Sequence, residues 1–238
     1  MRTSLVVVML ALGAACDRGD VRTAAASRAS HSTSRHYLPA SVPATGRHSI
    51  LIEGTSLTAG LGLDPDQAWP AVLQQRIDSE GLPFQVVNAG LSGETSAGAL
   101  RRIDWLLRGP VDVFVLETGA NDGLRGLDPD SLRGNIEGIL AKVKAARPGA
   151  VLCVVQMEAP PNLGADYAAR FHAVYAEAAR ASGARLLPFL LDGVAGHAAL
   201  NQGDGMHPTA QGARLVAATE WQALEPILRS IDGGLKSM

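Results

Sequence analysis

The sequence predicts a three-layer α/β/α sandwich around a five-stranded parallel sheet. Five short apolar runs recur along the chain without strict alternation of apolar and polar residues, which is typical of strands buried on both faces. Segments with apolar residues at helical spacing separate these runs, and such alternation gives a parallel sheet covered on both sides by helices. The expected strands cover residues 48–52, 84–87, 111–116, 151–157 and 185–187.

Helices are expected between these strands and after the last one. Pro70 falls in the first turn of the first helix, where its missing N–H is tolerated. A later helix is expected to begin at Ser131 and to end at Pro148, because proline cannot continue it. The last helix is expected to begin at Pro208 and has an apolar stripe. The first helix covers residues 67–80, and the two remaining expected helices cover residues 95–107 and 166–181.

The composition of the 238-residue chain suits one domain with a sizeable core. Hydrophobic residues make up 47% of the chain, and the formal net charge is −2. No basic stripe indicates nucleic-acid binding, so no such partner is expected. Residues 48–238 are expected to form the domain. Residues 17–47 are rich in Ser, Ala, Thr and Arg without apolar periodicity, and they are expected to form a disordered tether.

The first 16 residues are typical of an export signal. Arg2 supplies the positive start, residues 5–12 form an apolar centre too short to span a bilayer, and small residues follow. Cys16 comes next, where bacterial lipoprotein signals have the cysteine that receives lipid; the alternative is a cysteine beside a conventional cleavage site. We therefore expect an exported protein that is periplasmic, anchored to a membrane through Cys16, or secreted. Cys153 lies in an apolar run and is expected to be a buried core thiol.

Residues suited to acyl-transfer chemistry follow four of the five expected strands. Ser56 follows the first strand, Gly93 the second, Asn121 the third, and Asp204 and His207 the fifth. Because the carboxyl ends of parallel strands meet at one edge of a sheet, we expect these residues to converge. A serine, an imidazole, a carboxylate and two hydrogen-bond donors are the parts needed for acyl transfer.

Each of these residues also has a purely structural interpretation. Ser56 could cap a helix, Asp204 could form a turn, and Asn121 begins an Asn-Asp-Gly turn sequence. The three-residue offset between Asp204 and His207 favours a pair in which the carboxylate orients the imidazole. Ser56 would then be the nucleophile. Its backbone N–H, the Gly93 N–H and the Asn121 amide would form an oxyanion hole.

Four sequence blocks resemble the SGNH, or GDSL, hydrolase family, most of all its branch of thioesterase I, lysophospholipase L1 and arylesterase enzymes. The blocks occur in the family's order and extend over nearly the whole expected domain. One departure is clear: the family usually has aspartate before the serine, where this chain has Thr55. The blocks cover residues 54–60, 87–96, 119–126 and 204–208.

The resemblance implies an SGNH hydrolase fold and a serine esterase that hydrolyses acyl esters and thioesters, lysolipids among them. The family takes its triad acid from the C-terminal block, which is intact here, so Thr55 removes no catalytic group. The resemblance also implies a loop over 124–130 that moves on substrate binding, and a second loop over 158–164 that walls the cleft. The expected substrate contacts are Leu124, Pro160 and Asn162.

Two other functions stay open at this point. A flavodoxin-like sheet can bind phosphate in a Ser/Thr-rich loop after its first strand, which would make the chain a non-catalytic binding lipoprotein. A carbohydrate O-deacetylase of the same superfamily would prefer short acyl groups. No cluster of histidines, cysteines and carboxylates has the spacing of metal ligands, so no metal is expected. We also expect no cofactor and a monomeric protein.

Overall fold

The computed structural model describes residues 46–236 of the chain. The expected signal peptide over 1–16, its Cys16 and the tether as far as residue 45 lie outside this part. No helix within residues 46–236 combines the length and the apolar character needed to cross a membrane.

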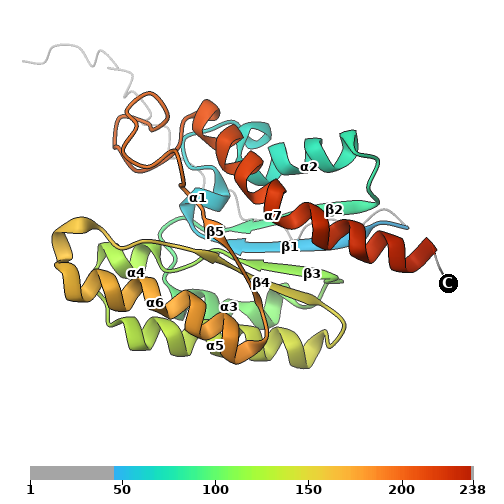
Figure 1. Cartoon of the computed structure of the whole chain (residues 1–238), viewed down its shortest axis with the longest axis horizontal. Coiled ribbons are helices and arrows are strands. Elements are labelled where there is room, and N and C mark those ends of the chain that lie inside the picture. Colours follow the sequence, from blue (N-terminus) through green and yellow to red (C-terminus); the bar gives the residue numbers. More distant parts are fainter. Residues whose placement is uncertain (1–45, 237–238) are drawn as a thin grey trace, which may run out of the picture. The chain divides into compact units, whose positions relative to one another are not determined.

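Five strands form one parallel sheet, which confirms the predicted fold class (Figure 1). The strand order is β2-β1-β3-β4-β5, the flavodoxin-like order of doubly wound sheets. The three central strands are buried on both faces, as their lack of alternation indicated; Ile50 and Ile52 alternate with Leu51, and all three lie in the core. The two edge strands are only partly buried, and Leu186 in the last one is exposed. The strands are β1 (His48–Gly54), β2 (Phe84–Gly90), β3 (Val113–Leu116), β4 (Val151–Gln156) and β5 (Arg185–Phe189).

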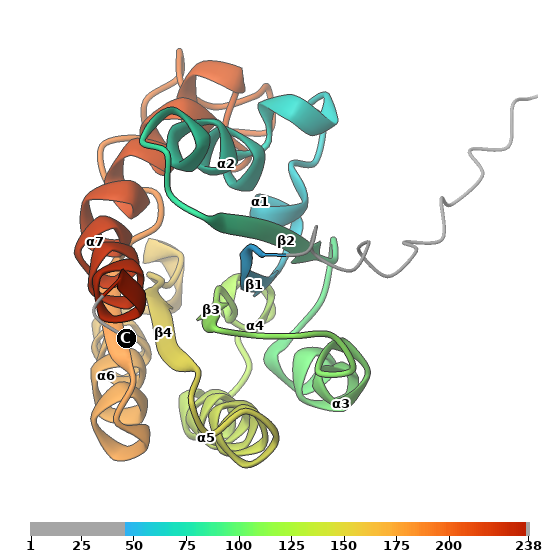
Figure 2. The same cartoon turned by 90° about the vertical axis from the view of Figure 1, so that its right-hand side faces the viewer.

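Helices cover both faces of the sheet (Figures 1 and 2). Two helices pack together on one face, and the apolar stripe of the last one is buried against the sheet. Three helices cover the other face, with α5 between α3 and α6. The first pair is α2 (Trp69–Ser79) and α7 (Ala210–Lys236), and the second group is α3 (Ser96–Leu106), α5 (Pro129–Ala146) and α6 (Ala165–Ser182).

All five long helices begin one or two residues from their expected starts: α2 begins two residues late, α3 one residue late and α6 one residue early. α5 begins at Pro129 rather than at Ser131, because Asp128 takes the N-cap position and proline fits the first turn. α7 begins at Ala210 rather than at Pro208, because Pro208 pairs with Asn201 in an isolated antiparallel bridge. The chain therefore stays extended for two residues after the expected start.

Short helices occupy parts of two expected loops. α1 (Ser56–Ala59) follows β1, and α4 (Ala120–Leu124) follows β3. The loop expected over 124–130 is therefore shorter than predicted, because Leu124 ends α4 and Pro129 begins α5. Single 3₁₀ turns, η1 (Pro65–Gln67) and η2 (Pro161–Leu163), lie before α2 and after β4. All these segments lie at or near the carboxyl edge of the sheet, where the site was expected.

Candidate active site

The turn from β1 into α1 places Ser56 at the carboxyl edge of the sheet. β1 ends at Gly54, where a Cβ would lie 2.2 Å from Thr58 Oγ1, so only glycine allows this close approach. Thr55 caps α1 by accepting a hydrogen bond from the Leu57 N–H at 3.4 Å, and Ser56 is the first residue of the helix. The interpretation of Ser56 as a helix cap is therefore wrong, because Thr55 has that position.

Ser56, His207 and Asp204 form a continuous chain of hydrogen bonds. His207 Nε2 lies 2.9 Å from Ser56 Oγ, and His207 Nδ1 lies 2.6 Å from Asp204 Oδ2. The backbone N–H groups of His207 and Met206 donate to Asp204 Oδ1, and these bonds hold the pKa of that carboxyl well below its usual range. An ionised carboxylate can only accept, so Nδ1 donates to Asp204 and Nε2 is left to accept from the serine hydroxyl.

Gln202 ties the loop that contains His207 to the segment after α1. Its Nε2 donates to Leu61 O at 2.7 Å and to Pro208 O at 2.9 Å, and its backbone N–H donates to His207 O at 2.7 Å. Gly62, in this segment, has φ +79° and lies close to the Gln202 side chain, so its backbone conformation favours glycine. These contacts join segments 141 residues apart in the chain and keep the imidazole opposite the serine hydroxyl.

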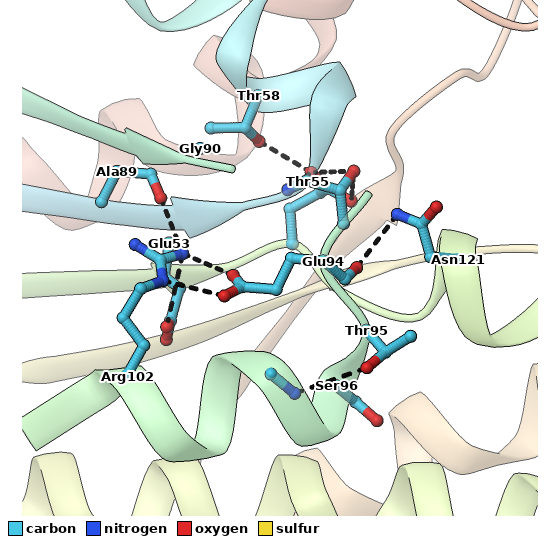
Figure 3. A network of polar contacts seen from close by, with 12 residues as sticks. Glu53, Thr55, Thr58, Ala89, Gly90, Glu94, Thr95, Ser96, Arg102 and Asn121 are labelled. Carbon is cyan, nitrogen blue, oxygen red and sulfur yellow. Dashed lines mark hydrogen bonds and ion pairs between the residues drawn. The ribbon is translucent and has the colours of Figure 1, made fainter. Parts of the chain in front are cut away.

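The two expected oxyanion-hole residues lie on neighbouring segments. Asn121 Nδ2 donates to Glu94 O at 3.0 Å (Figure 3), which orients the amide and leaves its second N–H available. Gly93 has φ +79°, and no atom lies within 4 Å of the place where its Cβ would be, so backbone conformation rather than space favours glycine. Asn121 lines the same cavity as Ser56, whereas Gly93 is not among the lining residues.

Arg102, on α3, binds the Glu94 side chain (Figure 3). Its Nε donates to Glu94 Oε1 at 2.9 Å, and its Nη2 donates to Glu94 Oε2 and to Ala89 O. A guanidinium suits such paired contacts because its donors form a rigid fork. Glu94 follows Gly93 in the chain, and its carbonyl accepts a hydrogen bond from Asn121. By binding Glu94, Arg102 therefore fixes the segment next to the two expected oxyanion-hole donors, Gly93 and Asn121. Sequence reasoning missed Arg102, whose only signal was its place eight residues after Glu94.

Glu117 lies directly after β3 and supports the turn that contains Ser56. Its carboxylate accepts from the Thr55 N–H at 2.7 Å, from the Thr55 hydroxyl at 3.0 Å and from the Thr58 hydroxyl at 2.8 Å. Burial raises the pKa of Glu117, and these hydrogen bonds oppose the rise. Sequence reasoning missed this contact too, because its partners are about 60 residues apart in the chain.

A cavity of about 390 Å³ opens beside Ser56 and His207. Leu124 and Pro160, which were expected to contact the acyl chain, line this cavity, and Asn162 does not. The wall is mostly apolar, and the volume suits a small-molecule ligand. Apolar wall residues include Leu57, Met157, Phe189 and Leu191.

In the described part of the chain, two other candidate side chains, Cys153 and His197, do not line this cavity. Cys153, in β4, is fully buried as predicted, and burial raises the pKa of its thiol to about 12. His197, a histidine close to the C-terminal block, does not line the cavity. Within residues 46–236, no group of three His, Cys, Asp or Glu side chains could hold a metal ion.

Comparison with known proteins gives consistent matches over the described domain. The model of the GDSL-like lipase/acylhydrolase family matches residues 54–215. Esterase TesA of Pseudomonas aeruginosa is 39% identical over 181 residues, which are 76% of this chain and 89% of that protein. Thioesterase 1/protease 1/lysophospholipase L1 of Escherichia coli is 36% identical over 188 residues, which are 78% of this chain and 87% of that protein.

A solved structure agrees with the fold as well. The psychrotrophic esterase EstA from Pseudoalteromonas, in a structure inhibited by monoethylphosphonate, is 33% identical and superimposes with a TM-score of 0.72 over 76% of this chain and 99% of that one. The family match extends from the glycine that ends β1 into α7, so it includes all four sequence blocks. The chain therefore belongs to the GDSL-like lipase/acylhydrolase family and is a carboxylic ester hydrolase.

Proposed function

We propose that this enzyme is a serine esterase that acts through Ser56, His207 and Asp204 and a covalent acyl-enzyme. The main support is the chain of hydrogen bonds from Asp204 through His207 to Ser56, next to an apolar cavity. A serine hydroxyl is a weak nucleophile at neutral pH and needs a base within hydrogen-bond reach. His207 lies at that distance, and an ionised Asp204 stabilises the imidazolium that forms.

In the proposed reaction, Ser56 Oγ attacks the carbonyl carbon while His207 Nε2 takes the hydroxyl proton. The N–H groups of Ser56, Gly93 and Asn121 stabilise the oxyanion of the tetrahedral intermediate. When this intermediate collapses, the bond to the alcohol or thiol breaks and the leaving group takes the proton from His207. Water then attacks the acyl-serine with His207 as the base, which releases the acid and restores the Ser56 hydroxyl.

Esters and thioesters with an apolar acyl group are the proposed substrates. The apolar wall of the cavity supports this class, because each buried methylene contributes about 0.8 kcal/mol. The names of the relatives include esterase, thioesterase and lysophospholipase, which agrees with one site that accepts several leaving groups. The same wall disfavours the alternative of a carbohydrate O-deacetylase, whose substrates are polar.

We also propose that the enzyme works outside the cytoplasm. The pattern of residues 1–16 supports export, and a lipid on Cys16 would anchor the enzyme to a membrane. All residues of the proposed site come from one chain, so catalysis needs no second copy.

Hydrolysis of p-nitrophenyl esters, from acetate to long acyl chains, tests this function. We expect the wild-type chain to hydrolyse them. Ser56→Ala and His207→Ala should each lower kcat by about 10⁴-fold or more, because each removes one member of a unit that works together. His197→Ala is the matched control: it removes a histidine outside the cavity and should keep the wild-type rate.

Two results other than the expected one have different meanings. A wild-type rate in Ser56→Ala or in His207→Ala would contradict the proposed mechanism. Serine-dependent turnover that is confined to acetyl esters would support the mechanism and favour the deacetylase over the esterase of longer acyl groups.

A further inference from the structure

One charged side chain lies in the apolar wall of the cavity. Among the described residues that line it, Glu158 is the only one with an acidic or basic side chain other than His207. Between residues 46 and 236, no lysine or arginine lines the cavity. An acidic residue therefore borders any substrate bound there, and its one ion-pair partner among the described residues is His172.

The surroundings of Glu158 orient its carboxylate. Glu158 follows β4, and its Oε1 lies 2.7 Å from His172 Nδ1 and 3.4 Å from Gln156 Nε2. Its Oε2 has no hydrogen-bond partner within residues 46–236, and 38% of the side chain is exposed. One oxygen is thus held by the protein, while the other accepts no hydrogen bond from the described residues.

We propose that Glu158 makes the enzyme prefer esters that have a positive charge on the group that enters this cavity. This inference rests on the proposed esterase function. Apolar cavity walls of low dielectric strengthen the field of a carboxylate, which attracts cations and repels anions. The charge could be on either side of the ester bond, on the acyl group or on the alcohol. Quaternary ammonium groups are the simplest such cations, because they do not titrate.

Two pairs of esters of matched shape separate charge from size. The leaving-group pair is hexanoylcholine and 3,3-dimethylbutyl hexanoate, in which carbon replaces the quaternary nitrogen. The acyl-group pair is the p-nitrophenyl ester of 6-(trimethylammonio)hexanoate and that of 7,7-dimethyloctanoate. The measurement is the ratio of kcat/KM for the cationic ester to kcat/KM for the neutral ester in each pair.

Variants of Glu158 test whether its carboxylate causes the preference for the cationic ester. We expect Glu158→Gln, which keeps the shape, to lower the ratio about five- to ten-fold in at least one pair. A change that affects both esters of a pair equally cancels in this ratio. Glu158→Lys should lower the ratio further. His172→Gln keeps a hydrogen-bond donor beside Glu158 but removes any charge of the imidazole, so the ratio should persist. Glu177→Gln, an exposed acid on α6, is the matched control.

The pair that responds shows which part of the substrate lies beside Glu158. A ratio that stays the same in Glu158→Gln for both pairs, while the neutral esters are still hydrolysed in a Ser56-dependent way, would overturn this inference and leave the proposed function intact. If Ser56→Ala hydrolyses the neutral esters as fast as the wild type, the proposed function fails and this inference fails with it.

Discussion

At the scale of single residues, Thr55 shows how this chain differs from the usual Gly-Asp-Ser-Leu block. The Thr55 side chain is buried, donates to Glu117 and accepts from the Leu57 N–H. An aspartate at this position would place a second carboxylate beside the buried Glu117, and like charges at such a distance cannot both ionise easily. A threonine hydroxyl instead donates a hydrogen bond to Glu117, so the turn before Ser56 is fixed without a second charge.

We expect Thr55→Val to lower both stability and activity. Valine keeps the branched shape but removes one donor to Glu117 and the cap of α1, which together should cost about 1–3 kcal/mol in the free energy of unfolding. The value of kcat should fall because the turn that positions Ser56 loosens. Urea unfolding and ester hydrolysis measure the two effects.

Thr118→Val is the matched control for this prediction. Thr118 is also buried and adjoins Glu117, but its hydroxyl has no hydrogen-bond partner within residues 46–236. Its replacement should therefore leave stability unchanged or raise it. Equal stability and equal kcat in Thr55→Val and Thr118→Val would show that the hydroxyl of Thr55 contributes nothing.

At the scale of elements, the sheet and its main helices could be predicted from apolar pattern alone. Buried parallel strands have a distinct pattern, and α5 and α6 have boundaries marked by proline or glycine. The convergence of Ser56, Asn121 and His207 followed from one rule, that loops after parallel strands meet at one edge. The geometry agrees with that rule, since these three residues line one cavity.

The short helices could not be predicted in the same way. α1 and α4 have four and five residues, too few for a helical period to show in the sequence. α4 depends on a contact distant in sequence: Gly119 has φ +102°, and a Cβ there would lie 2.1 Å from the Tyr175 hydroxyl. The contacts of Glu117 and Arg102 could not be predicted from the sequence either, because they join segments that only the tertiary fold brings together.

At the scale of the whole molecule, two buried carboxyls make stability depend on pH. Glu53 and Glu220 are fully buried, and their oxygens have no hydrogen-bond partner within residues 46–236. Burial raises the pKa of each to about 8 from the usual 4.5, although Arg102 opposes the rise for Glu53. Between pH 4.5 and about 8, both carboxyls keep a proton in the folded state and lose it in the unfolded state. The free energy of unfolding therefore falls as pH rises through this range.

We expect Glu220→Gln to weaken this dependence. Glutamine has nearly the same shape as a protonated glutamate but no proton to lose. The fall in the free energy of unfolding between pH 5 and pH 8 should therefore shrink, by an amount on the order of a few kcal/mol. Urea unfolding at several pH values measures it, with the exposed Glu177→Gln as control. An identical slope in wild type and Glu220→Gln would mean that Glu220 ionises normally in the fold.

Covalent labelling of Ser56 tests the proposed mechanism most directly. A p-nitrophenyl alkylphosphonate transfers its phosphonyl group to an activated serine, and mass spectrometry of the digested protein locates the adduct. We expect a single adduct on Ser56 that forms together with loss of ester hydrolysis, no adduct in Ser56→Ala and a much slower reaction in His207→Ala. An adduct on another residue, with Ser56 unmodified and hydrolysis abolished, would show that the catalytic nucleophile lies elsewhere.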